Sequence, residues 1–273
     1  MRNYSSYMPK HTLVNIDTNR MKSVGLVLSG GGVRGMAHIG LIKALNERNI
    51  SAQVVSGSSV GALVGALYAN ENSVDDMLTF FKETPLFKYS FLTILKPGFI
   101  DTDRYVKVFR AYFPENSFKA LKRELHIVAT NLQKGEQLFF SDGELIRPLL
   151  ASAALPPVFS PVEIENQLFA DGGIMNNFPL EPVVDKADFI IGSNVSAIGE
   201  LHKNALKNSL QITGRVTGLM IYAINHQKLE ACDFLVEYEE LEKIGVLDRK
   251  GIEKAYQIGY EYASKKLDEL IKK

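Results

Sequence analysis

Residues 24–35 (VGLVLSGGGVRG) and 53–69 (QVVSGSSVGALVGALYA) decide the fold of this 273-residue chain. In each stretch a short apolar run of strand length ends at a glycine-bounded turn, and a helical pattern follows. After the first turn, Met36, Ile39 and Ile42 recur every three residues. Two successive strand–turn–helix units predict parallel strands joined by helices, because parallel pairing needs a long connection. The expected fold class is therefore α/β.

The rest of the chain extends this pattern. Residues 125–130 and 137–140 are predicted to form a strand pair around Lys134-Gly135, and residues 188–195 form a strongly apolar run of strand length. No internal repeat or low-complexity linker interrupts the sequence. Helices are expected at residues 35–49, 60–69, 144–154, 208–229 and 251–272.

The composition is that of a globular protein, with 46% hydrophobic and 23% charged residues. Thirty-one basic residues balance thirty-one acidic ones, so no global field favours nucleic acid or an anionic membrane. Cys232 is the single cysteine and cannot form an internal disulfide. Residues 1–20 lack the apolar segment of a secretion signal, and no run of about 18 apolar residues occurs. We expect a cytoplasmic protein whose contact with lipid, if any, is peripheral.

The pentapeptide Gly57-Ser58-Ser59-Val60-Gly61 matches the G-x-S-x-G pattern between a predicted strand and a predicted helix. A nucleophile elbow places its serine on a strained turn, where flanking glycines leave the room that a Cβ would fill. The amides at the start of the following helix also favour a developing negative charge. Ser59 is therefore the candidate nucleophile, although the same letters also fit a plain glycine-rich turn.

A second glycine stretch, GGGVRG at residues 30–35, matches the dinucleotide-binding pattern G-x-G-x-x-G. That reading requires an acidic residue about 20 positions further on, at the end of the second strand. Residues 54–58 (VVSGS) offer none. The alternative is an oxyanion loop, whose backbone amides stabilise a tetrahedral intermediate. Arg34 either supports this loop or binds an anionic part of the substrate.

The base that a nucleophilic serine needs is less obvious. Five histidines are present, and none lies in a telling motif. A histidine-assisted serine remains open, with His126 or His226 as the partner. Asp171-Gly172-Gly173 offers another candidate, a carboxylate at the end of a short apolar run in a turn free of side chains. Asp-Gly is also a favoured pair in ordinary turns.

The three motifs, in this order, resemble the signatures of patatin-like phospholipases. The stretch ASAALPPVF at residues 151–159 is similar to the family's segment before its aspartate. The resemblance covers roughly residues 22–270, which implies a polar N-terminal arm (1–21) and one acyl hydrolase domain (22–273). It implies a three-layer fold with a mainly parallel central sheet flanked by helices. It also implies a Ser59-Asp171 dyad without histidine, an oxyanion and substrate loop of Gly30, Gly31, Gly32, Arg34 and Gly35, an elbow held by Gly57 and Gly61, and an aspartate loop completed by Gly172 and Gly173.

An aspartate with an ordinary pKa near 4 is a weak base for a hydroxyl group, so the dyad requires a buried carboxylate with a raised pKa. The substrate implied by the resemblance is a phospholipid, lysophospholipid or related acyl ester. The sequence has no metal-ligand spacing, and we expect neither a metal nor a cofactor. The apolar cluster at residues 86–100 either flanks an acyl pocket or belongs to the core. A lipid-binding protein of the same fold that has lost turnover is the alternative from another class.

Overall fold

The computed structural model describes residues 22–84 and 101–271 of the chain. The expected N-terminal arm (1–21) and the apolar cluster at 86–100 therefore lie outside the described residues. Within the described ranges, no helix is both long enough and apolar enough to span a bilayer.

All named strands join one sheet, in the order β5-β6-β3-β2-β1-β7-β8, with β4 also paired to β3. The pairs from β3 through β2, β1 and β7 to β8 are parallel, whereas β4, β5 and β6 pair antiparallel. The strands are β1 (Val24–Leu28), β2 (Val54–Ser58), β3 (Glu124–Asn131), β4 (Glu136–Phe140), β5 (Val162–Ile164), β6 (Gln167–Asp171), β7 (Phe189–Asn194) and β8 (Phe234–Glu237).

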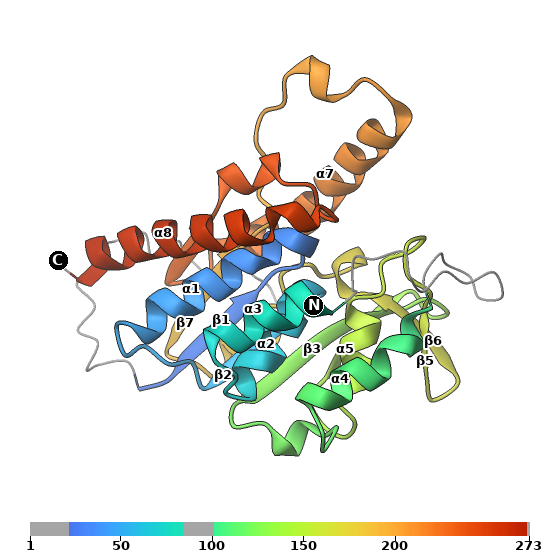
Figure 1. Cartoon of the computed structure of the whole chain (residues 1–273), viewed down its shortest axis with the longest axis vertical. Coiled ribbons are helices and arrows are strands. Elements are labelled where there is room, and N and C mark those ends of the chain that lie inside the picture. Colours follow the sequence, from blue (N-terminus) through green and yellow to red (C-terminus); the bar gives the residue numbers. More distant parts are fainter. Residues whose placement is uncertain (1–21, 85–100, 272–273) are drawn as a thin grey trace.

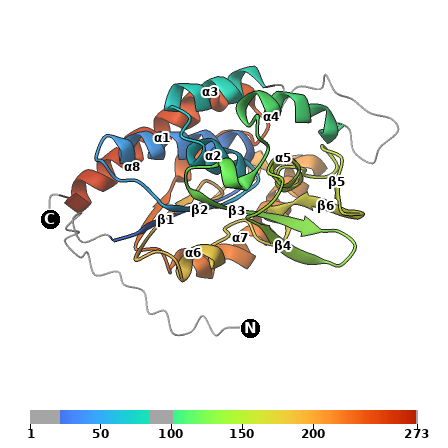
Figure 2. The same cartoon turned by 90° about the horizontal axis from the view of Figure 1, so that it is seen from below.

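Helices cover both faces of this sheet, which gives three layers (Figures 1 and 2). The α/β fold with a mainly parallel central sheet is thus confirmed. One face carries α1 (Met36–Asn46), α2 (Val60–Ala69), α3 (Val74–Glu83), α4 (Val106–Tyr112), α5 (Ile146–Ser152) and α8 (Ile252–Ile271). The other face carries α6 (Glu181–Val184) and α7 (Ser209–Leu229).

Small residues bring the helices of the first face close to their neighbours. Every residue of α2 is buried, and the helix packs against β2 and β3. Where α1 meets α8, a Cβ on Gly259 would collide with the backbone of Ala37, and one on Gly40 with the backbone of Tyr260. These glycines therefore set the close approach of the two helices.

The predicted elements differ from the observed ones mainly at their ends. The helix expected at 35–49 is preceded by a 3-10 turn, Gly32–Gly35, and the helix expected at 144–154 is shorter at both ends. Strands β5 and β8 and helices α3, α4 and α6 were not predicted. The start of α3 does carry a local signal, because Ser73 and Asp76 form a reciprocal capping box at its first turn.

Candidate active site

The turn between β2 and α2 holds Ser59 in a conformation that L-residues rarely adopt, with φ 53° and ψ −125°. The flanking glycines are required by packing. A Cβ on Gly57 would meet the backbone of Gly61, and a Cβ on Gly61 would meet the carbonyl oxygens of Leu28 and Ser29. Ser59 is half-buried, whereas all of β2 and α2 around it is buried. The turn thus presents one hydroxyl from an otherwise closed surface.

Strand β3 brings the two candidate catalytic side chains together. It pairs parallel with β2, so that Val128 lies opposite Ser58. It pairs antiparallel with β6, so that Ala129 lies opposite Asp171. Because Val128 and Ala129 are neighbours in β3, the ends of β2 and β6 lie close together. Asp171 therefore lies beside the β2–α2 turn.

The hydroxyl of Ser59 donates a 2.6 Å hydrogen bond to Oδ2 of Asp171, which is 112 residues further along the chain. The other carboxylate oxygen, Oδ1, accepts a 2.7 Å hydrogen bond from the amide of Gly173. The main chain of Asp171 is also fixed, because its amide donates to Ala154 and its carbonyl oxygen accepts from the Thr130 hydroxyl. Asp171 therefore has a single orientation, aimed at Ser59.

Burial changes the acidity of this carboxyl group. Asp171 is only 3% exposed. Loss of hydration raises its pKa to about 6, although the hydrogen bonds from Ser59 and Gly173 favour the charged form and oppose the shift. At neutral pH the group is still mostly a carboxylate, and it is a stronger base than an exposed aspartate. The aspartate loop needs its glycines, because a Cβ on Gly172 would meet the Val128 carbonyl oxygen and one on Gly173 the Asn177 side chain.

The histidines considered as alternative bases are engaged elsewhere. His126 bonds Glu124 and lies beside Lys186. His226 is exposed on α7, where it stacks on Tyr222. Within the described ranges, Ser59 has no hydrogen bond to any histidine, and the structure gives no support to a histidine-assisted serine.

The glycine loop after β1 lies directly against Ser59, because a Cβ on Gly30 would come within 3.1 Å of the Ser59 Cβ. The three glycines do not play equivalent roles. The amide of Gly30 donates to the Asn177 carbonyl oxygen, and its own carbonyl oxygen accepts from the Ser196 hydroxyl. The amides of Gly31 and Gly32, by contrast, have no hydrogen-bond acceptor in the part of the chain that the structure describes, and both residues are partly exposed. Gly30 therefore anchors the loop and leaves Gly31 and Gly32 as available donors.

Arg34 supports the loop from behind. Its Nε donates to the Ile244 carbonyl oxygen at 2.7 Å, and Nη2 donates to the Glu242 carbonyl oxygen at 3.1 Å. Of the two roles considered for Arg34, the structure favours the supporting one. Gly32 adopts a positive φ of 58°, and a Cβ there would collide with the carbonyl of Val246. Gly35 allows the loop to pack on α2, because a Cβ there would meet the side chain of Val60.

Two further residues hold this arrangement, and neither lies in a motif that predicts such a role. The Ser152 hydroxyl accepts a 2.9 Å hydrogen bond from the Ser59 amide, and Ser152 is fully buried at the end of α5. His38, also fully buried, contacts the Ser29 carbonyl oxygen through Nε2 and the Ser193 hydroxyl through Nδ1. Burial lowers the pKa of His38 to about 4, so the ring is neutral at pH 7. Both side chains fix backbone beside Ser59.

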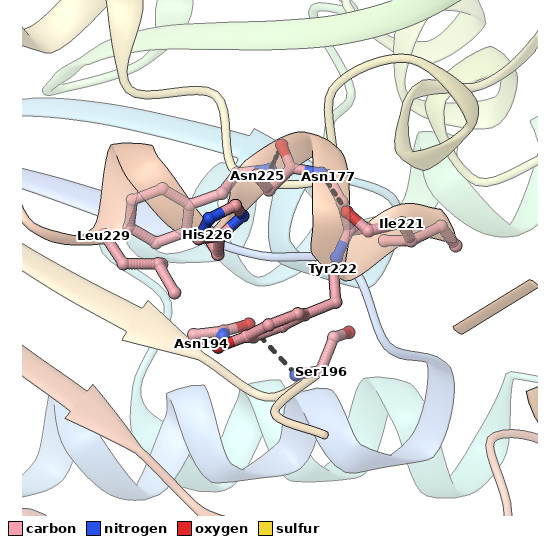
Figure 3. Close-up of a pocket in the computed structure, with 9 residues that line it drawn as sticks. Asn177, Asn194, Ser196, Ile221, Tyr222, Asn225, His226 and Leu229 are labelled. Atoms are coloured by element: carbon pink, nitrogen blue, oxygen red, sulfur yellow. Dashed lines mark hydrogen bonds between the residues drawn. The ribbon is translucent and has the colours of Figure 1, made fainter. Parts of the chain in front are cut away.

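A small pocket lies behind the glycine loop and does not include Ser59 or Asp171 (Figure 3). Side chains of α7 face residues at the end of β7 across it. Ser196 and Asn177 line the pocket and also bond the carbonyl oxygen of Gly30. The pocket therefore marks the contact between α7 and the glycine loop. Within residues 22–84 and 101–271, no group of three or more His, Cys, Asp or Glu side chains is placed to hold a metal ion.

Known proteins are similar in sequence over the part of the chain that carries this site. The patatin-like phospholipase family matches residues 26–184, which include the glycine loop, Ser59 and Asp171. An uncharacterised NTE family protein of Mycobacterium bovis is 31% identical over 195 residues, which cover 69% of this chain and 53% of the relative. Lysophospholipase NTE1 of Coccidioides immitis is 27% identical over 280 residues, which cover 91% of this chain and 18% of that protein. The chain thus spans about half the length of the bacterial relative and a smaller share of the fungal one.

Among solved structures, VipD from Legionella pneumophila is similar with a TM-score of 0.53 and 17% sequence identity. The match covers 91% of this chain and 67% of VipD. This likeness supports the three-layer fold and nothing further.

Proposed function

The chain belongs to the patatin-like phospholipase family, and from this premise we propose that it is a serine acyl hydrolase acting on lipid esters. Ser59 is the nucleophile and Asp171 the general base. The observation that carries the proposal is the 2.6 Å hydrogen bond from the Ser59 hydroxyl to a buried carboxylate whose pKa is raised to about 6. A base whose pKa lies near the working pH is suited to accept the proton of a hydroxyl group.

In the first half of the reaction, the Ser59 oxygen attacks the ester carbonyl carbon while its proton passes to Oδ2 of Asp171. The carbonyl oxygen becomes an oxyanion. Asp171 then gives the proton to the leaving alcohol oxygen as the carbon–oxygen bond breaks, and an acyl-Ser59 ester remains. In the second half, Asp171 takes a proton from water, the resulting hydroxide attacks the acyl ester, and the proton returns to Ser59 as the fatty acid leaves.

The oxyanion is stabilised by backbone amides. The free amides of Gly31 and Gly32 are available from the glycine loop, and the amide of Val60, at the start of α2, follows the nucleophile directly. An amide after the nucleophile paired with one from a neighbouring loop is the usual oxyanion arrangement on such turns. Removing one such donor typically lowers the rate on the order of a hundredfold.

The substrate class follows from the family and from the named relatives. Since the fungal relative is named a lysophospholipase, we propose acyl esters of lysophospholipids or phospholipids as substrates. The site needs no metal for this chemistry, because backbone amides stabilise the charge that develops.

A fluorophosphonate probe tests the nucleophile and the base directly, because it reacts only with an activated serine. We expect the intact mass of the wild-type protein to rise by one adduct, and Ser59→Ala and Asp171→Asn to remain unlabelled. Ser58→Ala is the matched control. Its hydroxyl is buried beside Ser59 and has no hydrogen-bond partner in the described structure, so labelling should persist.

Hydrolysis of a lysophospholipid, a diacyl phospholipid and a soluble p-nitrophenyl ester then identifies the substrate class. Labelling of Asp171→Asn at the wild-type rate would exclude Asp171 as the base. A wild-type protein that is neither labelled nor active, yet retains phospholipid, would instead support the lipid-binding alternative.

A further inference from the structure

Helix α7 exposes an apolar face that nothing in the described structure covers. The side chains of this face are 43% to 63% exposed, and they recur with the spacing of one side of a helix. We call them the α7 stripe: Ile212, Val216, Leu219, Met220 and Ile224. A Cβ added to Gly214 would have no heavy atom within 4 Å, so α7 is also open at this position.

The stripe faces away from the rest of the described structure. The side of α7 that contacts the protein carries Asn225 and Leu229, both buried, and Arg215, which pairs with Glu242. An ordinary surface helix buries its apolar side and exposes its polar side. In α7 the apolar stripe is exposed instead, which is typical of a helix that meets a second apolar phase.

The segment that carries the stripe has basic residues but no acidic ones of its own. Between Leu201 and Leu229 the sequence contains no Asp or Glu. Lys203 and Lys207, in the segment leading into α7, are exposed, and no carboxylate of the described residues lies within ion-pair distance of either. A helix with an exposed apolar face and adjacent lysines fits the boundary between headgroups and acyl chains of an anionic bilayer.

Helix α7 also lies at the end of the sheet that carries the β2–α2 turn with Ser59. Helix α7 follows β7, and it projects beyond the carboxyl edge of the parallel strands (Figure 1). The Asn225 side chain accepts from the Phe178 amide, and Ser196, which faces α7 across the pocket of Figure 3, bonds the Gly30 carbonyl oxygen. Helix α7 is thus connected to the glycine loop that lies against Ser59.

We propose that the α7 stripe inserts into the surface of a bilayer that contains anionic phospholipid, with Lys203 and Lys207 among the headgroups. This orientation would bring the side of the molecule that carries Ser59 to the lipid surface. The functional significance of this binding rests on the proposed lipid hydrolase function, but the binding itself does not require turnover.

Flotation with vesicles tests the surface separately from the chemistry when all proteins carry Ser59→Ala. The probes are vesicles of phosphatidylcholine alone and vesicles with 30% phosphatidylglycerol. We expect the parent to float with the anionic vesicles and to bind neutral vesicles more weakly. Adding Met220→Glu should lower the binding constant for anionic vesicles at least tenfold. Ile271→Glu, which also replaces an exposed apolar residue but lies at the far end of α8, should bind like the parent.

Hydrolysis of a soluble ester separates this proposal from the proposed function. In the Ser59 background, Met220→Glu should hydrolyse the soluble ester within twofold of the wild-type rate, and circular dichroism should confirm an unchanged fold. Vesicle binding without any ester hydrolysis would overturn the function and leave the surface proposal standing. Failure of the parent to float, or equal flotation of Met220→Glu, would overturn the surface proposal. So would a concentration-dependent dimer that Met220→Glu dissociates, since the stripe would then bind a second copy of the chain.

Discussion

Helices α2 and α7 are both rich in small and apolar residues, yet α2 is buried and α7 is largely exposed. All ten residues of α2 are buried against the sheet. Of the α7 residues whose side chains the structure describes, only Asn225 and Leu229 are buried. Both helices lie beside the candidate site, α2 directly after Ser59 and α7 behind the glycine loop. Apolar composition therefore does not say whether a helix belongs to the core or to a binding surface; the neighbours of the helix decide it.

The two helices also differ in how much change they should tolerate. At Gly61 of α2 an added methyl group would collide with the backbone of Leu28 and Ser29, so this position has no room for it. At Gly214 of α7 an added methyl group would have no heavy atom within 4 Å. Substitutions of the same kind in the two regions measure this difference directly.

The largest effect is expected for Gly61→Ala in α2. The new Cβ would lie 2.6 Å from the Ser29 carbonyl oxygen and closer still to that of Leu28, and backbone cannot move aside as a flexible side chain can. We expect a loss of about 2–3 kcal/mol in the free energy of unfolding and a kcat/KM at least 100-fold lower, since Ser59 shifts with the turn. Urea unfolding and soluble-ester kinetics measure both. Wild-type values for this variant would show that the inner region is not tightly packed.

The second prediction uses the pH dependence of the rate to test the burial of Asp171. The base is the carboxylate form of Asp171, and burial raises the pKa of this group to about 6. As the pH falls below 6 the group takes up a proton, so kcat/KM should drop about tenfold per unit. A profile that bends near pH 4 instead would mean that Asp171 is solvated.

Stability provides a control for the same group. The pKa of Asp171 in the folded protein, about 6, exceeds the ordinary aspartate pKa of 3.8. Its contribution to stability is therefore full below pH 4 and is lost as the pH rises through 6. Asp171→Asn removes this ionisation, so at pH 8 the variant should be more stable than the wild type by about 1–3 kcal/mol. The difference should disappear near pH 3.5.

A smaller effect is expected when the β2–α2 turn loses the hydrogen bond between the Ser59 amide and the Ser152 hydroxyl. Ser152→Ala deprives the Ser59 amide of its acceptor, and an unpaired buried amide costs about 1–3 kcal/mol. We expect kcat to fall about tenfold with little change in KM, because the substrate itself does not touch Ser152. Ser56→Ala is the matched control, since its buried hydroxyl has no partner in the described ranges. Equal rates for the two variants would leave Ser152 with no positioning role.

The smallest effect on stability is expected for a substitution in α7. Gly214→Ala places its methyl group in open space and gains helix propensity, so the free energy of unfolding should rise by up to about 1 kcal/mol. Hydrolysis of the soluble ester should not change. The substitution is chemically the same as Gly61→Ala, and the opposite sign of the two results would establish the contrast between the helices. A destabilised Gly214→Ala would show instead that this face of α7 is covered.

Local patterns predicted the framework well. The strand–turn–helix units around residues 30–35 and 57–61 formed as expected, because turns and helical periodicity depend on neighbours within a few positions. Helix ends were less accurate, and β8, a run of four residues, was missed. Such short apolar runs have too few positions to show a period.

The residues of the candidate site likewise include some that the sequence predicted and some that it did not. The motifs alone singled out Ser59 and Asp171 as candidates, and the resemblance to a family joined them. Ser152 and His38 were not found, since a serine or a histidine in an apolar segment has no pattern of its own. Their partners, the Ser59 amide and the Ser29 carbonyl oxygen, are visible only in the fold.

The sequence by itself determined the α/β class, the glycine turns and the chemical groups that the site can use. Only the tertiary structure decided that Ser59 and Asp171 touch across 112 residues, that Gly30 gives its amide to Asn177, and that α7 leaves its apolar stripe exposed. The physical reason is that these properties depend on interactions over different separations along the chain. Steric limits on the backbone act between near neighbours, whereas burial and hydrogen-bond partners depend on which distant segments pack together.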